Sequence, residues 1–394
     1  MQNADVVVVG AGPAGVCFAR SLAGSGLSVC VIEQQPRAAL AGAAFDGREI
    51  ALTHASRQIL EALGIWARLD PAEISPLRQA RVMDGHSPFA LTFAAGPGRD
   101  EALGWLVPNH LIRRAAWHSV QAQRGLEIRD ACSVRTIVPG AQRSRVTLSD
   151  GNVLAAQLVV AADSRFSSTR RMLGIGARSR DFGTSMLVCR MRIERPHAHT
   201  AWEWFGYGRT MALLPLNGDH ASVVITLPPR QMDALMALDA ADFGRTISAF
   251  FEHRLGAMHP VAVAQCYPLV GVYAQAFVAE RSALIGDAAV GMHPVTAHGF
   301  NLGLQSQHRL AAILRGAAAQ GGDIAARAGL AAYQRGHRRA SRPLYEATNA
   351  IATLYTDDRL PARVLRGAGL RLAHGVAPFR HMIAARLTER DALG

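Results

Sequence analysis

Two runs of apolar residues predict strands that are buried on both faces of a sheet. The residues after Asp5 are apolar through Val9, and Leu158–Ala162 is apolar throughout. Runs without polar alternation are typical of central strands in a parallel sheet. The first run leads into a glycine-rich turn, a helix that ends near Ala23, and a strand over Ser28–Ile32. This order predicts a βαβ unit at the start of the chain.

The glycine-rich turn has the spacing of a dinucleotide-binding fingerprint. Gly10 permits the tight turn, Gly12 lets a pyrophosphate approach the backbone, and Gly15 allows the helix to pack closely on the strand. Ala14 lies within the same turn, and Glu33 at the end of the second strand can hold a pair of ribose hydroxyls. The sequence therefore predicts a dinucleotide cofactor at this turn.

Further strands and helices follow in the first half of the chain. Amphipathic helices are predicted over His54–Leu63 and Asn109–Gln121, after a small-residue loop at Ala38–Gly47. Short strands are predicted over Leu126–Ile128, Ser133–Val138, Arg145–Leu148 and Leu154–Leu158, with a hairpin turn at Asp150-Gly151. An acid, Asp163, follows the second apolar run, at the strand end where open α/β sheets bind ligands.

The segment from about Arg180 to Gly271 predicts a separate antiparallel sheet. Its expected strands are Ser185–Ile193, Ala201–Phe205, Thr210–Leu214 and Ala221–Leu227, followed by helical segments within 231–255. The aromatic cluster Trp202-Glu203-Trp204-Phe205 is more typical of core packing than of a pocket wall. This sheet would form a platform over the cofactor.

A strand, a turn and a helix are predicted between residues 282 and 305. Ser282–Ile285 is a short buried strand, Gly286 and Asp287 form the turn, and a helix begins at Gly299. The unpaired N–H groups at the start of that helix favour an electron-rich ligand, and Asp287 can accept hydrogen bonds from ligand hydroxyls. Taken alone, the pattern also fits an ordinary strand–loop–helix connection.

Composition narrows the class of protein. The chain has 394 residues, enough for two or three lobes, and a formal net charge of +12. All of its basic residues other than histidine are arginine, and no aromatic-basic interleaving accompanies them, so we do not expect nucleic-acid binding. A preference for anionic partners remains.

The cysteines argue for a reducing compartment. Five dispersed cysteines without a C-x-x-C pair indicate neither a disulfide framework nor a metal site. The start of the chain lacks the features of a signal peptide, and no apolar run reaches membrane-spanning length. We expect a cytoplasmic protein, with any membrane contact peripheral at the inner face.

The last residues of the chain predict a basic amphipathic helical segment. Arginines alternate with apolar residues here, at Arg359, Arg363, Arg366, Arg371, Arg380 and Arg386. Such a segment can lie on an anionic membrane or partner. It can equally pack on the main domain, and the pattern does not choose between the two.

These motifs, taken in order, resemble those of the class A flavoprotein monooxygenases, the para-hydroxybenzoate hydroxylase-like group. The chain is most similar to the ubiquinone-biosynthesis hydroxylases. The resemblance rests on Gly10–Gly15 with Glu33, on Asp163-Ser164-Arg165-Phe166-Ser167-x-x-Arg170, and on Gly286-Asp287 followed by Pro294 and Gly299-Phe300-Asn301-Leu302-Gly303. It covers essentially the whole chain.

The resemblance implies an α/β fold with a Rossmann-like FAD-binding domain of the glutathione-reductase type. An antiparallel-sheet substrate domain is inserted into it, and a helical segment ends the chain. The implied FAD-binding domain comprises 1–75, 99–180 and 272–345, the substrate domain 76–98 and 181–271, and the C-terminal segment 346–394.

The resemblance also assigns roles to residues of the predicted site. Asp163 and its segment serve FAD and the nicotinamide donor, Gly286-Asp287 meets the ribityl chain, and Asn109 contacts the adenosine half. The helix start at Gly299, Asn301 and Leu302 faces the isoalloxazine ring, and Arg48 lies near the flavin. His293, Pro294 and His298 are the candidate catalytic residues, although such histidines are more often structural. Two departures stand out, Ser164 in place of a family glycine and Ala297-His298 in place of Gly-Gln.

The implied activity is hydroxylation of a ubiquinone precursor. FAD, reduced by NAD(P)H, would react with dioxygen to give a C4a-hydroperoxide that attacks the aromatic ring of a prenylated phenol or quinol. A homodimer, or membership of a ubiquinone-biosynthesis complex, fits the resemblance. The alternatives are a hydroxylase for a soluble phenol or secondary metabolite, and a non-catalytic FAD-binding accessory protein. A flavin halogenase is excluded, because those enzymes rely on a lysine and this chain has none.

Overall fold

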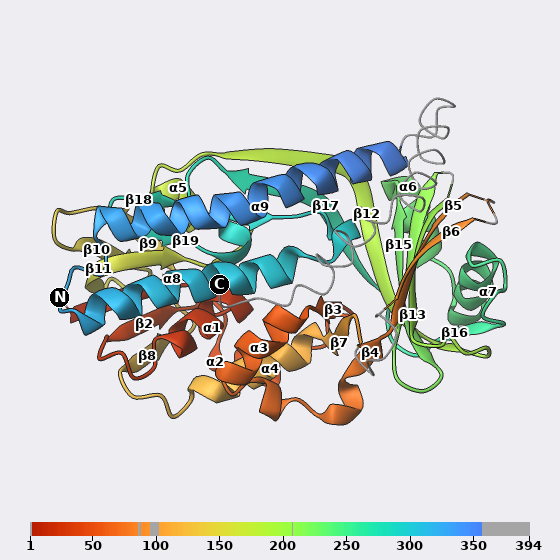
Figure 1. Ribbon diagram of the computed structural model, residues 1–394, viewed down its shortest axis with the longest axis horizontal. Coiled ribbons are helices and arrows are strands. Elements are labelled where there is room, and N and C mark those ends of the chain that lie inside the picture. The colour runs from red at the N-terminus through yellow and green to blue at the C-terminus, as the bar shows by residue number, and fades with distance from the viewer. Residues whose placement is uncertain (1, 86, 88, 95–101, 207, 357–394) are drawn as a thin grey trace.

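Three β-sheets organise the computed structural model, which describes residues 2–85, 87, 89–94, 102–206 and 208–356 (Figure 1). Within these residues, an eight-stranded sheet lies at one end of the molecule and a nine-stranded sheet at the other, with a three-stranded sheet between them. The fold is the mixed α/β architecture that the sequence predicts.

The eight-stranded sheet has a parallel centre. Its strands are β1 (Gln2–Val9), β2 (Val29–Ile32), β8 (Leu126–Arg129), β9 (Val134–Val138), β10 (Ser144–Leu148), β11 (Val153–Ala161), β18 (Val278–Ala279) and β19 (Ser282–Leu284). The order β19-β11-β1-β2-β8 is parallel throughout. Both apolar runs lie in it, since Val6–Val8 of β1 and Leu158–Ala161 of β11 are fully buried. This confirms the predicted parallel strands.

One strand differs from the prediction. Residues 154–158 and 158–162 were expected as two strands, whereas β11 is a single strand over Val153–Ala161. No turn residue interrupts this stretch, so it stays extended. Its first half also pairs antiparallel with β10, which accounts for the hairpin signal at Asp150-Gly151.

The helices pack on the eight-stranded sheet or on the far face of the nine-stranded sheet. They are α1 (Pro13–Ser21), α2 (Arg37–Gly42), α3 (His54–Ala62), α4 (Asn109–Val120), α5 (Ser168–Met172), α6 (Pro229–Met236), α7 (Ala240–Phe250), α8 (Gly299–Ala319) and α9 (Arg327–Thr356). Helix α8 packs between α1 and α9, and its N-terminal end points toward the nine-stranded sheet (Figure 1). The N-terminus of α8 therefore lies between the two large sheets.

The nine-stranded sheet is nearly all antiparallel. Its strands are β5 (Gln79–Asp84), β6 (Ala90–Ala94), β12 (Ala177–Ile193), β13 (Thr200–Gly206), β14 (Arg209–Pro215), β15 (His220–Leu227), β16 (Met258–Pro260), β17 (Gln265–Ala274) and β20 (Val290–Gly291). The order is β20-β17-β12-β15-β14-β13-β5-β6, with β16 beside β12, and only β13 and β5 run parallel. Strands β12 and β17 extend past residues 181 and 271, where the domain boundary was expected.

One face of the nine-stranded sheet carries its own core. Trp204 and Leu213 are buried there with Phe243 and Ile247 of α7, and Trp202 packs against the same cluster. The two tryptophans of the aromatic cluster therefore pack in a core, as the composition favours. The opposite face is turned toward the eight-stranded sheet (Figure 1).

The small sheet of β3 (Glu49–Leu52), β7 (Gly104–Pro108) and β4 (Ser75–Leu77) joins the two larger ones. The fully buried carboxyl of Glu49 on β3 pairs with Arg190 on β12 at 2.9 Å. Burial raises the pKa of Glu49 to about 7, although Arg190 acts in the opposite direction. This buried ion pair ties the nine-stranded sheet to the segment that contains Arg48.

No helix in the described part of the chain is both long enough and apolar enough to span a bilayer. The predicted basic segment, including Arg359 and the arginines after it, lies outside the described residues. Binding to an anionic membrane or partner and packing on the main domain therefore both stay predictions for this segment.

Candidate functional site

The glycine-rich turn between β1 and α1 leaves no space for larger residues at two of its glycines. Gly10 has φ +107°, and a Cβ atom there would lie 2.6 Å from the carbonyl oxygen of Ala162. A Cβ atom on Gly15 would lie 2.0 Å from the carbonyl oxygen of Gly10. The turn is therefore pressed against the end of β11, and both positions require glycine.

Gly12 differs from Gly10 and Gly15 because the space around its Cβ position is open. It forms the N-cap of α1, no side chain caps this helix, and no described atom lies within 4 Å of where its Cβ would be. Pro13 occupies the first helical position, where a missing N–H costs nothing. An open glycine at an uncapped helix start presents N–H groups and a positive helix dipole to an anionic ligand.

Glu33 supports the same turn from the end of β2. Its Oε2 accepts a hydrogen bond from the Ala11 N–H at 2.7 Å, and its Oε1 accepts one from the Gln35 N–H at 2.9 Å. The residue is 9% exposed. A buried carboxylate that already holds two N–H groups is fixed in position, and its remaining lone pairs can accept from hydroxyl groups.

The segment after β11 holds the turn that contains Gly286 and Asp287. Arg165 donates to the Asp287 carboxylate at 3.0 Å, and the buried guanidinium of Arg170 donates to the carbonyl oxygen of Ala288 at 2.9 Å. Asp163 accepts from the Thr169 N–H at 3.0 Å and from the Ser167 hydroxyl, so it fixes the start of α5. The second and third signature segments thus form one hydrogen-bonded unit.

Ser164 has the backbone conformation of a glycine. Its φ is +136°, in the region that side-chain-bearing residues rarely adopt. The family resemblance implies a glycine at this position. Ser164 therefore adopts a conformation that favours the implied glycine, and its Oγ accepts a hydrogen bond from the Phe166 N–H at 3.3 Å.

The N-terminus of α8 closes against α1 and the Gly286 turn. A Cβ on Gly286 would lie 2.8 Å from the Ala14 side chain, and a Cβ on Gly303 would lie 3.3 Å from Gly286. Gly299 has open space around its Cβ position, and no described side chain caps this helix. The α8 N-terminus therefore offers a second site for an electron-rich group.

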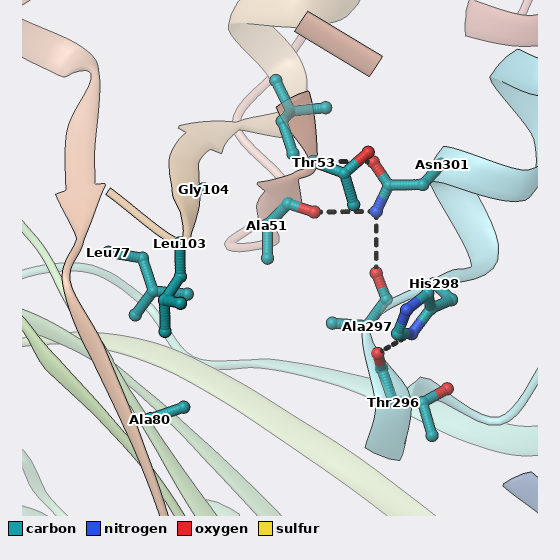
Figure 2. A pocket seen from close by; sticks show the side chains of 11 residues that line it. Ala51, Thr53, Leu77, Ala80, Leu103, Gly104, Thr296, Ala297, His298 and Asn301 are labelled. Atoms are coloured by element: carbon teal, nitrogen blue, oxygen red, sulfur yellow. Dashed lines mark hydrogen bonds between the residues drawn. The ribbon is translucent and has the colours of Figure 1, made fainter. Parts of the chain in front are cut away.

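Asn301 connects α8 to β3 at the edge of the cavity in front of this helix. Its Nδ2 donates to the carbonyl oxygens of Ala51 at 2.8 Å and Ala297 at 3.1 Å, and its Oδ1 accepts from the Thr53 N–H at 3.2 Å (Figure 2). Leu302 is 4% exposed and packs in the core. The cofactor-binding role of both residues stays a prediction, and the hydrogen bonds of Asn301 hold the helix start in place.

A small cavity of about 40 Å³, partly open to solvent, lies in front of α8. Its lining includes Ala51 and Thr53 on one side, Thr296 and His298 on another, and Leu103 and Ala80 toward the nine-stranded sheet (Figure 2). The wall of this cavity is mostly apolar.

The candidate catalytic residues lie in the loop before α8. His298 lines the cavity, and its Nδ1 contacts the Thr296 carbonyl oxygen. His293 packs edge-on against Phe182, and its Nδ1 accepts from the Val295 N–H at 3.2 Å. Burial, reinforced by Arg165 and Arg180, lowers the pKa of His293 to about 4, so its imidazole is neutral and a weak base.

Pro294 begins a short 3₁₀ turn, η4 (Pro294–Thr296), between those histidines. It stiffens the loop because its ring fixes φ. No contact of Pro294 or His293 reaches the cavity among the described residues that line it. Their catalytic role stays a prediction, and only His298 among the three faces the cavity.

Arg48 and Asn109 meet at a fourth carboxylate, Asp46. Arg48 pairs with Asp46 at 2.7 Å, and Asn109 donates to the same oxygen at 2.7 Å. The pKa of Asp46 is lowered by Arg48 and Asn109, which outweigh its burial. Asp46 lies in the predicted small-residue loop and was not singled out from the sequence, because an isolated loop acid has no distinguishing pattern.

Known proteins are similar to this chain over nearly its whole length. A protein-family model described as an FAD binding domain matches residues 3–348. The chain belongs to this FAD-binding family. Ubiquinone hydroxylase UbiM of Neisseria meningitidis is 44% identical over 98% of this chain and 85% of its own length. Ubiquinone hydroxylase UbiL of Rhodospirillum rubrum is 34% identical over 99% of this chain and 90% of its own length.

Solved structures support the fold of this FAD-binding family member. The monooxygenase PqsL of Pseudomonas aeruginosa, solved with 2-aminobenzoylacetate, has a TM-score of 0.77 at 23% identity and covers 94% of this chain and all of its own. The p-nitrophenol 4-monooxygenase PnpA of Pseudomonas putida has a TM-score of 0.78 at 18% identity, over 98% of this chain and 99% of its own. The predicted resemblance and fold class are confirmed.

FAD fits the residues of the site. The open Gly12 and the uncapped start of α1 suit a pyrophosphate, and the buried Glu33 beside them suits the hydroxyls of a ribose. The second uncapped helix start, at Gly299, suits the electron-rich ring of the flavin. FAD is therefore the cofactor of this protein.

Proposed function

We propose that this protein is an FAD-dependent monooxygenase that hydroxylates the aromatic ring of a ubiquinone-biosynthesis intermediate, using NAD(P)H and dioxygen. The observation that carries the proposal is the similarity, over nearly the whole chain, to proteins named ubiquinone hydroxylase at 44% and 34% identity. A 3-demethoxyubiquinol 3-hydroxylase of Escherichia coli is also similar, at 28% identity over 94% of this chain.

The residues of the site suit this chemistry. Bound FAD supplies the redox chemistry and the activation of dioxygen. The backbone at Gly12 and the Glu33 carboxylate would hold its pyrophosphate and ribose, and Asp287, oriented by Arg165, would hold its ribityl hydroxyls. The α8 N-terminus would stabilise negative charge on the reduced ring, and the apolar cavity in front of it would limit the access of water.

The activity can be tested by complementation. We expect this gene to restore ubiquinone synthesis in a bacterium that lacks one ring hydroxylase, and the intermediate that disappears identifies the ring carbon. Lipid extracts analysed by mass spectrometry provide the measurement. An Asp287→Ala variant serves as the control for dependence on the cofactor site. Rescue of none of the ring-hydroxylase mutants, by a protein that binds FAD, would favour a soluble phenol as substrate.

Peripheral membrane contact and assembly are part of the same proposal. A prenylated substrate partitions into the bilayer, and the basic apolar sequence after Arg359 is of the type that binds anionic membranes. We expect the full chain to float with anionic liposomes, and a chain ending at Arg359 to stay in the dense fraction. Equal flotation of both would contradict a membrane role for this segment. The homodimer and complex remain proposals, to be measured by sedimentation of the purified chain.

A further inference from the structure

Glu203 is a carboxyl on the face of the nine-stranded sheet that is turned away from the α7 core. Strand β13 alternates, and Trp202 and Trp204 pack into that core. Because successive side chains of a strand point to opposite faces, Glu203 lies on the face turned toward the eight-stranded sheet. Its cross-strand neighbours are Val82 on β5 and Ala212 on β14.

Glu203 and its cross-strand neighbours form a row across the sheet, and this row continues with apolar residues. Ala212 pairs with Val224 on β15, and Val224 pairs with Val188 on β12. Val188 lies directly under the loop before Arg48, since a Cβ on Gly47 would come within 2.9 Å of it. Glu203 is therefore an acid in an apolar row that faces the FAD-binding part of the molecule.

The cavity in front of α8 adjoins the same face. Ala80 on β5 lines the cavity on its sheet side, opposite Thr296 and His298 (Figure 2). Ala80 is in register with Ala201, which lies two residues before Glu203 on β13. Strand spacing and rise place the Cα atom of Glu203 roughly 8 Å from that of Ala80. A glutamate side chain can reach from there to a ligand that extends from the cavity along the sheet.

No side chain in the described part of the chain pairs with Glu203 and would explain its position. Among the described residues, no hydrogen bond or ion pair to its carboxyl is formed, although the side chain is half-buried. Burial alone raises the pKa of Glu203 to about 8. A structural carboxyl in such surroundings usually has a compensating donor. A carboxyl that lacks such a donor and faces a cavity can accept a hydrogen bond from a ligand.

Other titratable groups on this side do not neutralise Glu203. Arg190 lies on the same face of β12 but is held by Glu49 at 2.9 Å. Asp84, two residues beyond Val82, adds a further acid on β5. His298 lies across the cavity, bound to the Thr296 carbonyl oxygen, and His293 packs behind it on Phe182.

We propose that the Glu203 carboxylate binds the ring hydroxyl of the aromatic substrate and accepts its proton. The inference rests on the proposed function, because oxygen insertion by an electrophile requires an electron-rich ring. In this step the O–H bond of the phenol breaks, an O–H bond forms on Glu203, and the electron pair remains on the phenolate oxygen. After the ring carbon has lost its own proton to water, the Glu203 carboxyl returns the proton to the ring oxygen.

The pH dependence of kcat/KM follows from the ionisation of the Glu203 carboxyl. Only ionised Glu203 can accept a proton, and its ionised fraction increases as the pH rises through about 8. With 2-prenylphenol as the probe substrate, we expect kcat/KM of the FAD-loaded enzyme to rise between pH 6 and pH 8. Glu203→Gln should lower kcat roughly 100-fold, remove this rise, and leave KM within a few-fold, because glutamine still accepts the phenol hydrogen bond.

Glu61→Gln is the matched control, because Glu61 is an exposed residue of α3 that pairs with Arg57 at 2.7 Å, far from the Glu203 row. It should retain the wild-type rate and pH profile. Product formation by Glu203→Gln at the wild-type rate and with the wild-type pH profile would overturn the role of Glu203 while leaving the proposed function standing. Failure of the wild-type enzyme to hydroxylate 2-prenylphenol would instead overturn the proposed function, and this inference with it.

A second measurement does not depend on turnover. The pKa of Glu203 is raised on folding, so its contribution to stability is full below the unfolded pKa and is lost as the pH rises through about 8. We therefore expect the Tm of Glu203→Gln to exceed that of the wild type increasingly between pH 6 and pH 9, whereas Glu61→Gln should follow the wild type. A pH-independent difference in Tm would mean that Glu203 ionises at its ordinary pKa, which contradicts the expected rise of kcat/KM between pH 6 and pH 8.

Discussion

Replacing Gly12 by valine is expected to weaken FAD binding strongly while leaving the fold intact. No described atom lies within 4 Å of the Cβ position of Gly12, so the protein itself has space for the new side chain. The backbone of Gly12 is extended, with φ −66°, which valine adopts readily. We expect a loss of about 1 kcal/mol in the free energy of unfolding, because valine is a poor N-cap.

The effect on FAD should be much larger than the effect on folding. The open side of Gly12 is where a pyrophosphate would approach the helix start, and a valine side chain would occupy it. We expect affinity for FAD to fall roughly 100-fold, or about 3 kcal/mol. Flavin fluorescence during titration of the FAD-free protein measures the affinity, and urea unfolding measures the stability.

The matched control for this substitution is Gly316→Val. Gly316 also has open space around its Cβ position, but it lies near the far end of α8. Valine at this helical position should be tolerated, and FAD affinity should be unchanged. If Gly12→Val bound FAD as tightly as Gly316→Val does, the cofactor would not approach the N-terminus of α1.

Replacing Glu33 by alanine is expected to weaken both the turn and its hold on the adenosine end of FAD. The buried Ala11 N–H would lose its acceptor at 2.7 Å. An unsatisfied buried N–H costs about 1–3 kcal/mol, so the free energy of unfolding should fall by that amount. The loss of the ribose contact should lower FAD affinity by a further ~100-fold, since hydrogen bonds to a charged group are worth about 1.5–3 kcal/mol each.

FMN provides the test of where Glu33 acts. FMN carries the isoalloxazine ring, the ribityl chain and one phosphate, but no adenosine ribose. Glu33→Ala should therefore weaken FAD binding far more than FMN binding, as measured by fluorescence titration. Equal weakening of both cofactors would place the effect of Glu33 in the turn alone and would remove its assignment to the ribose.

Local patterns predicted much of the cofactor site because each signature is short. Gly10 and Gly15 must be glycines, because a Cβ atom on either of them would collide with neighbouring backbone. The spacing of the glycines in the sequence already indicates this requirement. Strand, turn and helix at residues 282–305 were equally predictable, because they are local elements with clear apolar and glycine signals. Asp163 was recognised by its place at the end of an apolar strand.

Residue roles were harder to predict than residue positions. Asn301 was predicted at the start of a helix that faces the cofactor, but its hydrogen bonds to Ala51 and Thr53, about 250 positions away in the chain, could not be predicted. Arg165 belongs to the signature segment Asp163–Arg170, but its hydrogen bond to Asp287 joins two segments that meet only in the folded protein. Spacing along a chain carries no information on such pairs, because their contact depends on how the sheets pack.

The sequence by itself determined that this protein has a βαβ cofactor-binding unit, an inserted antiparallel sheet and a family resemblance confirmed over nearly the whole chain. These features depend on local periodicity and on short glycine-containing turns. Only the tertiary structure decided that Glu203 lies on the face toward the cavity with no partner among the described residues, and that Arg190 ties that face to Glu49. The physical reason is that burial and pairing depend on which strands become neighbours, and β13 acquires its neighbour β5 from more than 100 residues away.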